Sequence, residues 1–257
     1  MAKIALGSRK EVEDPEFPRS VFTELLLTFL FVFTGVGAAM SAEDMSGGQG
    51  SIMGLTAAAA TNAMLVAVMV AVGMDYSAGH LNPAVTIGFA AGGYVTVLRC
   101  ILYVVAQLLG SAAACFLLKY IAGAHDLPVH ALGSGIRPLQ GLLMELVLTF
   151  SMVISVYAIV MEPKTGVVSS NAPLLVGLIV GANTLAGGYF SGASMNPARS
   201  FGPALASWNW SDHWIYWAGP LVGSALAGFL YDRLYITRSR NDTALLLPAD
   251  EERSLLF

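Results

Sequence analysis

Charged residues are scarce in this sequence. Only 12% of the 257 residues are charged, whereas 56% are hydrophobic. A typical soluble domain carries about 25% charged residues, so this composition excludes an ordinary soluble protein and predicts one embedded in a membrane. The 13 Lys and Arg lie mostly near the ends of the chain and in short linkers, so we expect no nucleic acid among its partners.

Cysteine is also scarce. Cys100 and Cys115 both fall in or beside an apolar stretch, where we expect reduced packing residues and no disulfide framework. The polar N-terminal residues lack the pattern of a cleavable signal peptide, so the first apolar segment is expected to direct insertion. Neither a nucleophile–base pair nor a cluster of metal ligands stands out. We therefore expect no enzymatic activity, no metal and no cofactor.

Long apolar segments, in contrast, fill most of the chain. A transmembrane helix needs roughly 20 mostly apolar residues. Six segments meet this requirement, near 21–40, 54–74, 97–118, 139–160, 173–190 and 214–235. Two further apolar stretches, 83–92 and 197–206, are only about half a span long. The linkers are rich in Gly, Pro, Ser and charge, which is typical of turns.

The two halves of the chain repeat each other. TELLLTF at 23–29 corresponds to MELVLTF at 144–150, SAGHLNPAVTIG at 77–88 to SGASMNPARSFG at 191–202, and LYVVAQLLGSAAACF at 102–116 to IYWAGPLVGSALAGF at 215–229. Each half holds three spans and one short helix, and an odd number of spans forces the halves to insert with opposite orientation. The fold class predicted is therefore an all-α membrane protein with six transmembrane helices and two re-entrant half-helices in an inverted repeat.

This repeat divides the chain into five parts. We expect an N-terminal tail at 1–20, a first repeat at 21–121, a connecting loop at 122–138, a second repeat at 139–236 and a C-terminal tail at 237–257. With six spans, most basic residues fall on the side of the two termini, which predicts that both tails are cytosolic. These residues are Lys3, Arg9, Lys10, Arg19, Arg99, Lys164, Arg233, Arg238 and Arg240.

Each short helix begins with an Asn-Pro-Ala motif. Proline is favoured in the first turn of a helix and asparagine at its N-cap. In an inverted repeat the two half-helices enter from opposite faces and stop midway, with their partly positive N-termini facing each other. Non-helical backbone at that depth must line a cavity or be buried in protein. We therefore expect a pore centre that offers hydrogen-bond donors and repels cations, formed by Asn82, Pro83, Ala84, Asn196, Pro197 and Ala198.

The paired NPA motifs, the ExxxTF repeats and the six-span organisation resemble the aquaporin (major intrinsic protein) family over residues 21–236. SAGHLNPAVT, VGANTLAGG and SGASMNPARSFGPA are similar to the plant tonoplast intrinsic proteins within it. The resemblance implies a passive water channel, a homotetramer with one pore per protomer, and a multi-pass location in the lipid bilayer of the vacuolar membrane.

The resemblance also implies a second, narrower filter on the non-cytosolic side. The matching positions are Asn62, Thr184, Ala193 and Arg199. Strict water channels have an aromatic residue and a histidine where Asn62 and Thr184 stand, and many tonoplast members have His and Ile. Both residues are small and polar here, which predicts a wider opening that also passes urea, glycerol, ammonia or hydrogen peroxide. Tonoplast members with a histidine in the third external loop place it against the filter arginine, a position that His130 fits better than His125.

Other intramembrane residues have predicted supporting roles. We expect Val66 and Val180 to form an apolar pore wall, since each lies four residues from a filter position on one helical face. The backbone carbonyl of His80 is expected to line the pore while its ring packs on the cytosolic side. Glu24 and Glu145 are expected to accept hydrogen bonds from backbone amides of the two half-helix loops.

Three alternatives remain open from the sequence. The first is a facilitator whose main cargo is a small neutral solute rather than water. A more distant one is an ion-coupled secondary transporter, which also uses inverted repeats and broken helices. Such a transporter needs a coupling-ion site, and no unpaired intramembrane Asp or Lys supplies one. The third is a structural membrane protein with a closed pore, against which the polar filter argues.

Overall fold

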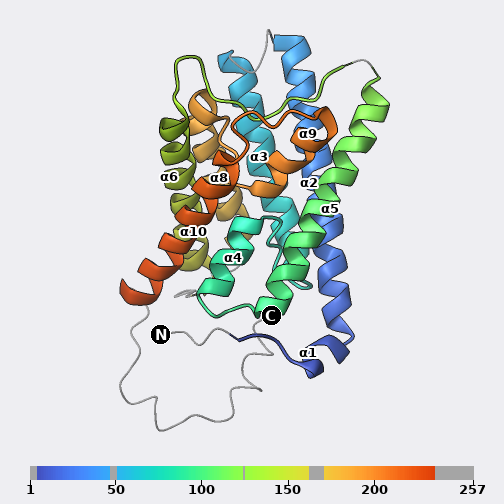
Figure 1. Cartoon of the computed structure of the whole chain (residues 1–257), viewed down its shortest axis with the longest axis vertical. Helices are drawn as coiled ribbons and strands as arrows, with labels where there is room; N and C mark the ends of the chain where they lie inside the picture. The colour runs from blue at the N-terminus through green and yellow to red at the C-terminus, as the bar shows by residue number, and fades with distance from the viewer. Residues whose placement is uncertain (1–4, 47–50, 124, 162–170, 235–257) are drawn as a thin grey trace.

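Helices account for nearly all of the described chain. The computed structural model describes residues 5–46, 51–123, 125–161 and 171–234, and these ranges hold helices and loops without strands. In chain order the helices are α1 (Arg9–Glu13), α2 (Glu16–Ser46), α3 (Ile52–Gly73), α4 (Pro83–Ala91), α5 (Val97–Ala122), α6 (Pro138–Val156), the π-helical turn η1 (Tyr157–Met161), α8 (Ala172–Ser191), α9 (Pro197–Ser207) and α10 (Ile215–Leu234) (Figure 1).

Long apolar helices correspond to all six predicted spans. Five are long and apolar enough to cross a membrane, in residues Glu16–Ala42, Ile52–Gly73, Val97–Ala122, Pro138–Val160 and Ala172–Ser191. The sixth span corresponds to α10, whose apolar part Ile215–Tyr231 is shorter. The all-helical membrane architecture is thus as predicted. The helix ends differ from the sequence-based limits because polar turns at either end continue some helices beyond their apolar cores.

Helix packing follows the inverted repeat. Helix α2 packs on α5 as α6 packs on α10, and α3 and α8 pack against each other. Both within-repeat crossings are close. A Cβ added at Gly110 of α5 would lie 2.4 Å from the carbonyl oxygen of Leu25, and one at Gly223 of α10 would lie 2.3 Å from that of Leu146. Glycine at these positions therefore lets the helix backbones touch.

The two half-helices enter the bundle from opposite ends. In Figure 1, α4 lies in the lower half and α9 in the upper half. They run over Pro83–Ala91 and Pro197–Ser207, within one residue of the predicted limits. Each packs against a long helix of the other repeat, α4 on α10 and α9 on α5. The half-helices therefore join the two repeats at the centre of the molecule.

The α1 helix and the C-terminal end of α10 lie at the same end of the bundle (Figure 1). The predicted tail at 1–20 includes α1 and the first turn of α2. Its described part is held to the start of α5, where Glu11 and Arg99 form an ion pair with Oε1 and Nε 3.0 Å apart. The predicted tail at 237–257 and Lys164 lie outside the described residues.

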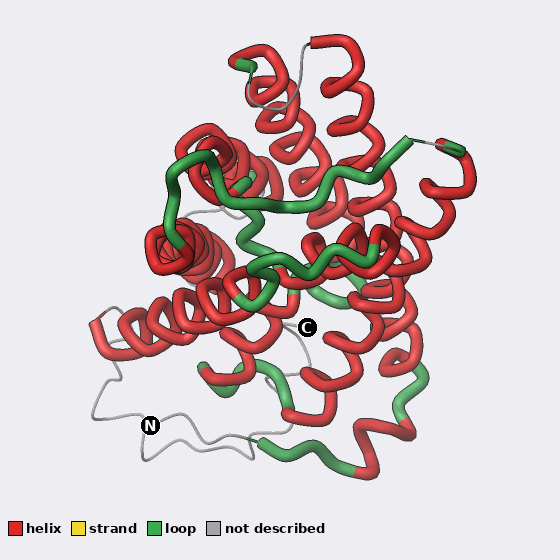
Figure 2. The backbone as a smooth tube through the Cα atoms, turned by 45° about the horizontal axis from the view of Figure 1, so that its top comes forward, coloured by secondary structure: helices red, strands yellow, loops and turns green. Residues whose placement is uncertain are grey.

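A long loop spans the opposite end of the bundle. It leads from α5 to α6 and crosses over the region of α9 in both views of the backbone (Figure 2). Its described residues, 125–137, contain His130, whose side chain is part-buried against α9. This loop, which connects the two repeats, thus places a polar side chain against the second half-helix.

Candidate functional site

Asn82 and Asn196 cap the two half-helices at the centre of the bundle. The Oδ1 of Asn82 accepts from the backbone N–H of Ala84 at 2.8 Å, and the Oδ1 of Asn196 accepts from that of Ala198 at 3.0 Å. Both asparagines have extended backbone angles, as N-caps require. The capping predicted from sequence is therefore present in both helices.

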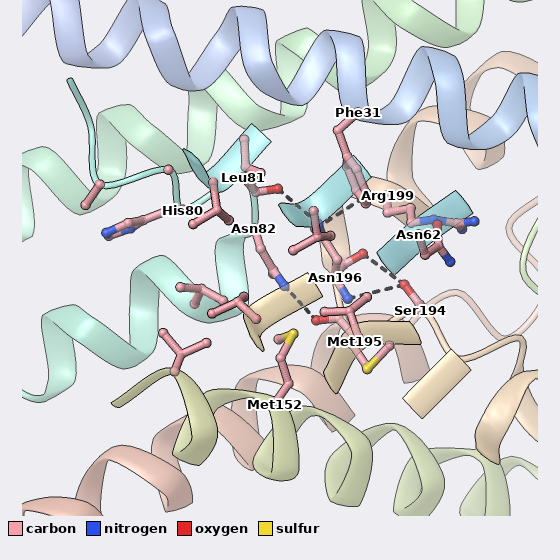
Figure 3. Close-up of a pocket in the computed structure, with 18 of the residues that line it drawn as sticks. Phe31, Asn62, His80, Leu81, Asn82, Met152, Ser194, Met195, Asn196 and Arg199 are labelled. Carbon is pink, nitrogen blue, oxygen red and sulfur yellow. Dashed lines mark hydrogen bonds between the residues drawn. The ribbon is translucent and has the colours of Figure 1, made fainter. Parts of the chain in front are cut away.

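The same two asparagines cross-link the repeats. The Nδ2 of Asn82 donates to the carbonyl oxygen of Met195 at 2.8 Å, and that of Asn196 donates to the carbonyl oxygen of Leu81 at 2.9 Å (Figure 3). A side-chain amide carries two N–H donors. One donor of each amide is thus used between the loops, and the second is left for a molecule in the cavity that both residues line.

The loops before the half-helices share an unusual backbone. Leu81 and Met195, at matching places in the repeats, have φ of +56° and +54°. Gly79 and Ala193 also match, with φ of +62° and +50°. Residues other than glycine rarely adopt this left-handed region, and each instance costs about 1–3 kcal/mol. Surrounding hydrogen bonds must therefore hold these loops in place.

Two buried carboxylates supply those bonds. Glu24 accepts from the backbone N–H of His80 at 2.9 Å and of Leu81 at 2.8 Å. Glu145 accepts from the N–H of Ser194 at 2.9 Å and of Met195 at 2.7 Å. Both glutamates are fully buried. The carboxylates therefore satisfy backbone donors that the left-handed turns would otherwise leave without partners.

Polar side chains reinforce each carboxylate. Ser77 donates its hydroxyl to Glu24 at 2.6 Å, and Ser191 donates to Glu145 at 2.7 Å. The Nε2 of Gln107 also donates to Glu24, at 2.7 Å. The position of Gln107 in the second repeat is taken by Pro220, so Glu145 lacks that partner. Sequence reasoning missed these residues, although Ser77 and Ser191 begin the matching SAGH and SGAS segments.

A cavity runs past the two asparagines. It provides about 80 Å³ for the centres of water molecules, and a single water needs about 10–15 Å³ by this measure. Its lining includes the hydrogen-bond donors of Asn82, Asn196 and Arg199. Much of the lining is apolar wall, which includes the predicted Val66 and Val180 together with Phe31, Val70, Val85, Phe89, Met152, Val156, Val160 and Val176.

Phe31 and Met152 of that wall were not predicted. They occupy matching positions in the repeat, each seven residues after the glutamate of its ExxxTF motif. Seven residues are about two helical turns, so each side chain lies on the same face as the glutamate that supports the loop. That spacing is a signal from which both could have been found.

A second cavity, of about 50 Å³, lies on the side of the long loop. Asn62 and Arg199 line both cavities, whereas Thr184 lines the second and Ala193 the first. The Nδ2 of Asn62 donates to Thr184 Oγ1 at 3.3 Å, and Thr184 donates to the carbonyl oxygen of Val180 at 2.9 Å. The structure therefore gathers the four predicted filter residues where the cavities meet.

Arg199 contacts His130 from the long loop. Its Nη1 is hydrogen-bonded to His130 Nε2, and His130 Nδ1 lies 2.9 Å from Ser200 Oγ. Because a guanidinium only donates, His130 Nε2 must accept, which assigns the proton to Nδ1 in a neutral ring. Burial, and then the positive charge of Arg199, hold the pKa of His130 well below its usual range. His130 thus aligns Arg199 without adding a second charge.

Arg199 itself takes part in no ion pair within the described part of the chain. Among the described residues, the ion pairs involve Arg9, Arg19 and Arg99 only, all at the end of the molecule that carries α1. An arginine at membrane depth costs at least about 2.5 kcal/mol. Its position at the junction of the cavities creates a positive potential there.

His80 lies at the other end of the first cavity, which it lines. Its ring packs against Phe89 and Tyr103, with centroids 5.2 Å and 5.4 Å away, and its Nδ1 is 3.0 Å from Thr86 Oγ1. Pro83, Ala84, Pro197 and Ala198 do not line either cavity but are buried within the half-helices. The NPA proline and alanine are therefore placed to shape the half-helices, while the asparagines face the cavity.

Comparison with known proteins identifies the family. Residues 11–231 match the family described as "Major intrinsic protein". The chain belongs to the major intrinsic protein family. Its relatives in this family include "Aquaporin TIP4-4" of Zea mays, 55% identical over 98% of this chain and 99% of the relative. Another is "Aquaporin TIP4-1" of Arabidopsis thaliana, 50% identical over 100% of both chains.

A solved structure agrees with this assignment at the level of fold. The aquaglyceroporin from Plasmodium falciparum superposes with a TM-score of 0.72, covering 85% of this chain and 96% of its own, at 22% identity. The aquaporin fold and the resemblance to the TIP group of aquaporins are thereby confirmed. Aquaporins are channels, so this family member is a multi-pass membrane protein and not an enzyme.

Proposed function

We propose that this protein is a passive channel for water and for small neutral solutes, among them urea, glycerol, ammonia and hydrogen peroxide, and that it excludes protons and ions. One observation carries the proposal. The cavity between the half-helices is lined by the side-chain amides of Asn82 and Asn196 and by many apolar side chains, including those of Val66 and Val180. Such a lining holds each water by its oxygen and offers few competing bonds elsewhere.

The half-helices orient the water in the channel. Each N-terminus carries roughly half a positive charge, and the two face each other across the centre. A water bound there accepts from the free N–H groups of both asparagines, so its own hydrogens point away from the centre in both directions. Successive waters then turn in opposite senses on either side, which interrupts a continuous proton wire. The charge of Arg199 adds a barrier to cations.

Asn62 and Thr184 widen the range of solutes. The Thr184 hydroxyl donates to Val180 and accepts from Asn62, which leaves the Asn62 amide oxygen as an acceptor where the cavities meet. Arg199 supplies donors at the same junction. A junction that offers both donors and an acceptor can replace the hydration shell of a polar neutral solute, whereas an apolar junction cannot. This supports permeation of urea and glycerol beside water.

The channel functions as a homotetramer in the vacuolar membrane, with both termini in the cytosol and Arg199 toward the lumen. The assignment to the vacuolar membrane is supported by the names of its relatives, which are TIP aquaporins. The positions of Arg9, Arg19 and Arg99 at the end that carries α1 support the orientation, because basic residues gather on the cytosolic side. Large exposed apolar side chains, such as Phe22, Met64 and Val147, provide surface for lipid and for neighbouring protomers.

Stopped-flow light scattering on proteoliposomes tests the proposal. The same vesicles are shocked with an impermeant osmolyte, then with urea and with glycerol, beside empty liposomes and an Arg199→Val variant. Fast water flux with fast urea flux is the expected result. Fast water flux with slow solute flux would restrict the channel to water. Fast solute flux with little water flux would favour a solute facilitator. Water flux no faster than in empty liposomes would contradict an open channel.

A further inference from the structure

Two fully buried serines bind the NPA alanines of the opposite repeat. Ser224 of α10 donates its hydroxyl to the carbonyl oxygen of Ala84 in α4, at 2.6 Å. Ser111 of α5 donates in the same way to the carbonyl oxygen of Ala198 in α9. Both serines follow a glycine in the matching segments of the repeat. The fold thus makes the same side-chain contact twice, once to each half-helix.

Glycines in the half-helices make room for these serines. A Cβ added at Gly88 of α4 would lie 2.1 Å from Ser224 Oγ, and one added at Gly202 of α9 would lie 2.3 Å from Ser111 Oγ. Each glycine follows its alanine by four residues, and so lies on the same helical face. The hydroxyl can therefore reach the alanine carbonyl only because the next turn has no side chain.

The two contacts differ in one respect. The N–H of Gly202 donates to Ser111 Oγ at 3.1 Å, so this hydroxyl binds both Ala198 and Gly202. Those are the two residues that a regular helix joins directly. The next residue, Pro203, has no N–H for its own helical bond. Ser111 therefore bridges a weakened turn, and the first residue after Ala198 in that turn is Arg199.

We propose that Ser111 and Ser224 are positioning residues that set how far each half-helix reaches into the channel. Ser111 fixes the turn that carries Arg199 and so controls selectivity, whereas Ser224 fixes α4 and with it Asn82. The inference rests on the proposed channel function. It adds that each half-helix is held by a side-chain hydrogen bond from the other repeat as well as by its loop.

Serine-to-alanine variants test the effect on selectivity. Ser155 is the matched control, because its hydroxyl donates within its own helix, to Ser151 at 2.8 Å. The readout is the ratio of urea flux to water flux, which does not depend on how many channels fold. Losing one buried hydrogen bond corresponds to a change of about two- to tenfold in that ratio for Ser111→Ala. Ser224→Ala and Ser155→Ala should leave the ratio unchanged, because α4 and α6 supply no filter residue. An unchanged ratio in Ser111→Ala would overturn the role in selectivity.

A rescue experiment tests the contacts themselves. Gly88→Ala should unfold at a lower temperature in detergent and conduct poorly, and adding Ser224→Ala should return both the unfolding temperature and the conduction to the levels of Ser224→Ala alone. The added Cβ would then meet the Cβ of residue 224 at 3.5 Å, an ordinary contact. Ser111→Ala should not rescue Gly202→Ala, because the new Cβ also lies 2.5 Å from the carbonyl oxygen of Ser111 and 2.9 Å from Cys115 Sγ.

The outcomes separate this inference from the proposed function. Failure of Ser224→Ala to rescue Gly88→Ala, or equal rescue at both sites, would overturn the proposed contacts. The unfolding measurements need no transport. If the unmodified protein conducts no water in liposomes, the channel proposal fails, while the unfolding data still decide whether the serines hold the half-helices.

Discussion

Glu145→Ala should destabilise the second half-helix loop severely. The carboxylate is fully buried and accepts from Ser191 Oγ and from the backbone N–H groups of Ser194 and Met195, at distances of 2.7–2.9 Å. Alanine leaves both N–H groups buried without a protein acceptor. Each such group costs about 1–3 kcal/mol, so the two together cost about 2–6 kcal/mol before the missing side-chain volume is counted.

That cost is large beside the total stability of a folded domain, about 5–15 kcal/mol. The stability would be lost in the loop at Met195, which has left-handed backbone angles and whose carbonyl oxygen accepts from Asn82. We therefore expect both a lower unfolding temperature in detergent and a lower water flux per protein. Both values for Glu145→Gln should lie between those of Glu145→Ala and those of the unmodified protein. The glutamine side chain has one carbonyl oxygen, which can replace only one of the two accepting carboxylate oxygens.

Glu16→Ala is the matched control for that measurement. Glu16 pairs with Arg19 at the surface, and its side chain is 64% exposed. Substitutions at such sites usually change stability by no more than about 0.5 kcal/mol. If Glu145→Ala unfolds at the same temperature as Glu16→Ala and conducts water normally, then buried loop donors do not need this carboxylate, and the reasoning is refuted.

Three further predictions concern the filter. Arg199→Val should keep water flux but admit cations, seen as a current across planar bilayers under a voltage; an unchanged current would contradict the electrostatic role. Asn62→His combined with Thr184→Ile should narrow the junction and lower urea flux relative to water by about tenfold or more, measured by stopped flow; an unchanged ratio would show that these residues do not set the width. Burial lowers the pKa of His130 in the folded protein. The His130 side chain therefore takes up a proton near pH 6.5 in the unfolded chain but stays neutral in the folded protein at that pH. Stability should therefore fall as pH drops from 7.5 to 5.5, and this fall should be smaller in His130→Gln, where the buried His213 still contributes.

The repeat and the caps could be predicted because their signals are local. Apolar length predicts spans, and Asn before Pro predicts a helix start whatever the surroundings. The matching segments around Asn82 and Asn196 then indicate two inverted halves. Glu24 and Glu145 were found for the same reason, since an acid repeated at one place in two apolar spans needs a partner in each half.

The filter contacts depend on residues far apart in the chain. His130 and Arg199 are separated by 69 residues, and Asn62 and Thr184 by 122. Family resemblance suggested these positions, but their hydrogen bonds, and therefore the neutral ring of His130, follow only from the folded arrangement. The serine contacts to Ala84 and Ala198 have no local signal of their own, because a serine in an apolar helix commonly bonds to its own backbone.

The amino-acid sequence alone establishes a membrane-embedded inverted repeat with two capped half-helices, because apolar length, helix caps and internal repetition are signals carried by neighbouring residues. Which groups line the cavity and which support its walls follows from contacts between distant parts of the folded chain. Left-handed backbone at Leu81 and Met195 turns each loop onto the opposite asparagine, and neither residue type favours that conformation. The buried carboxylates make it stable, since a conformation disfavoured locally persists only when distant partners satisfy its hydrogen bonds.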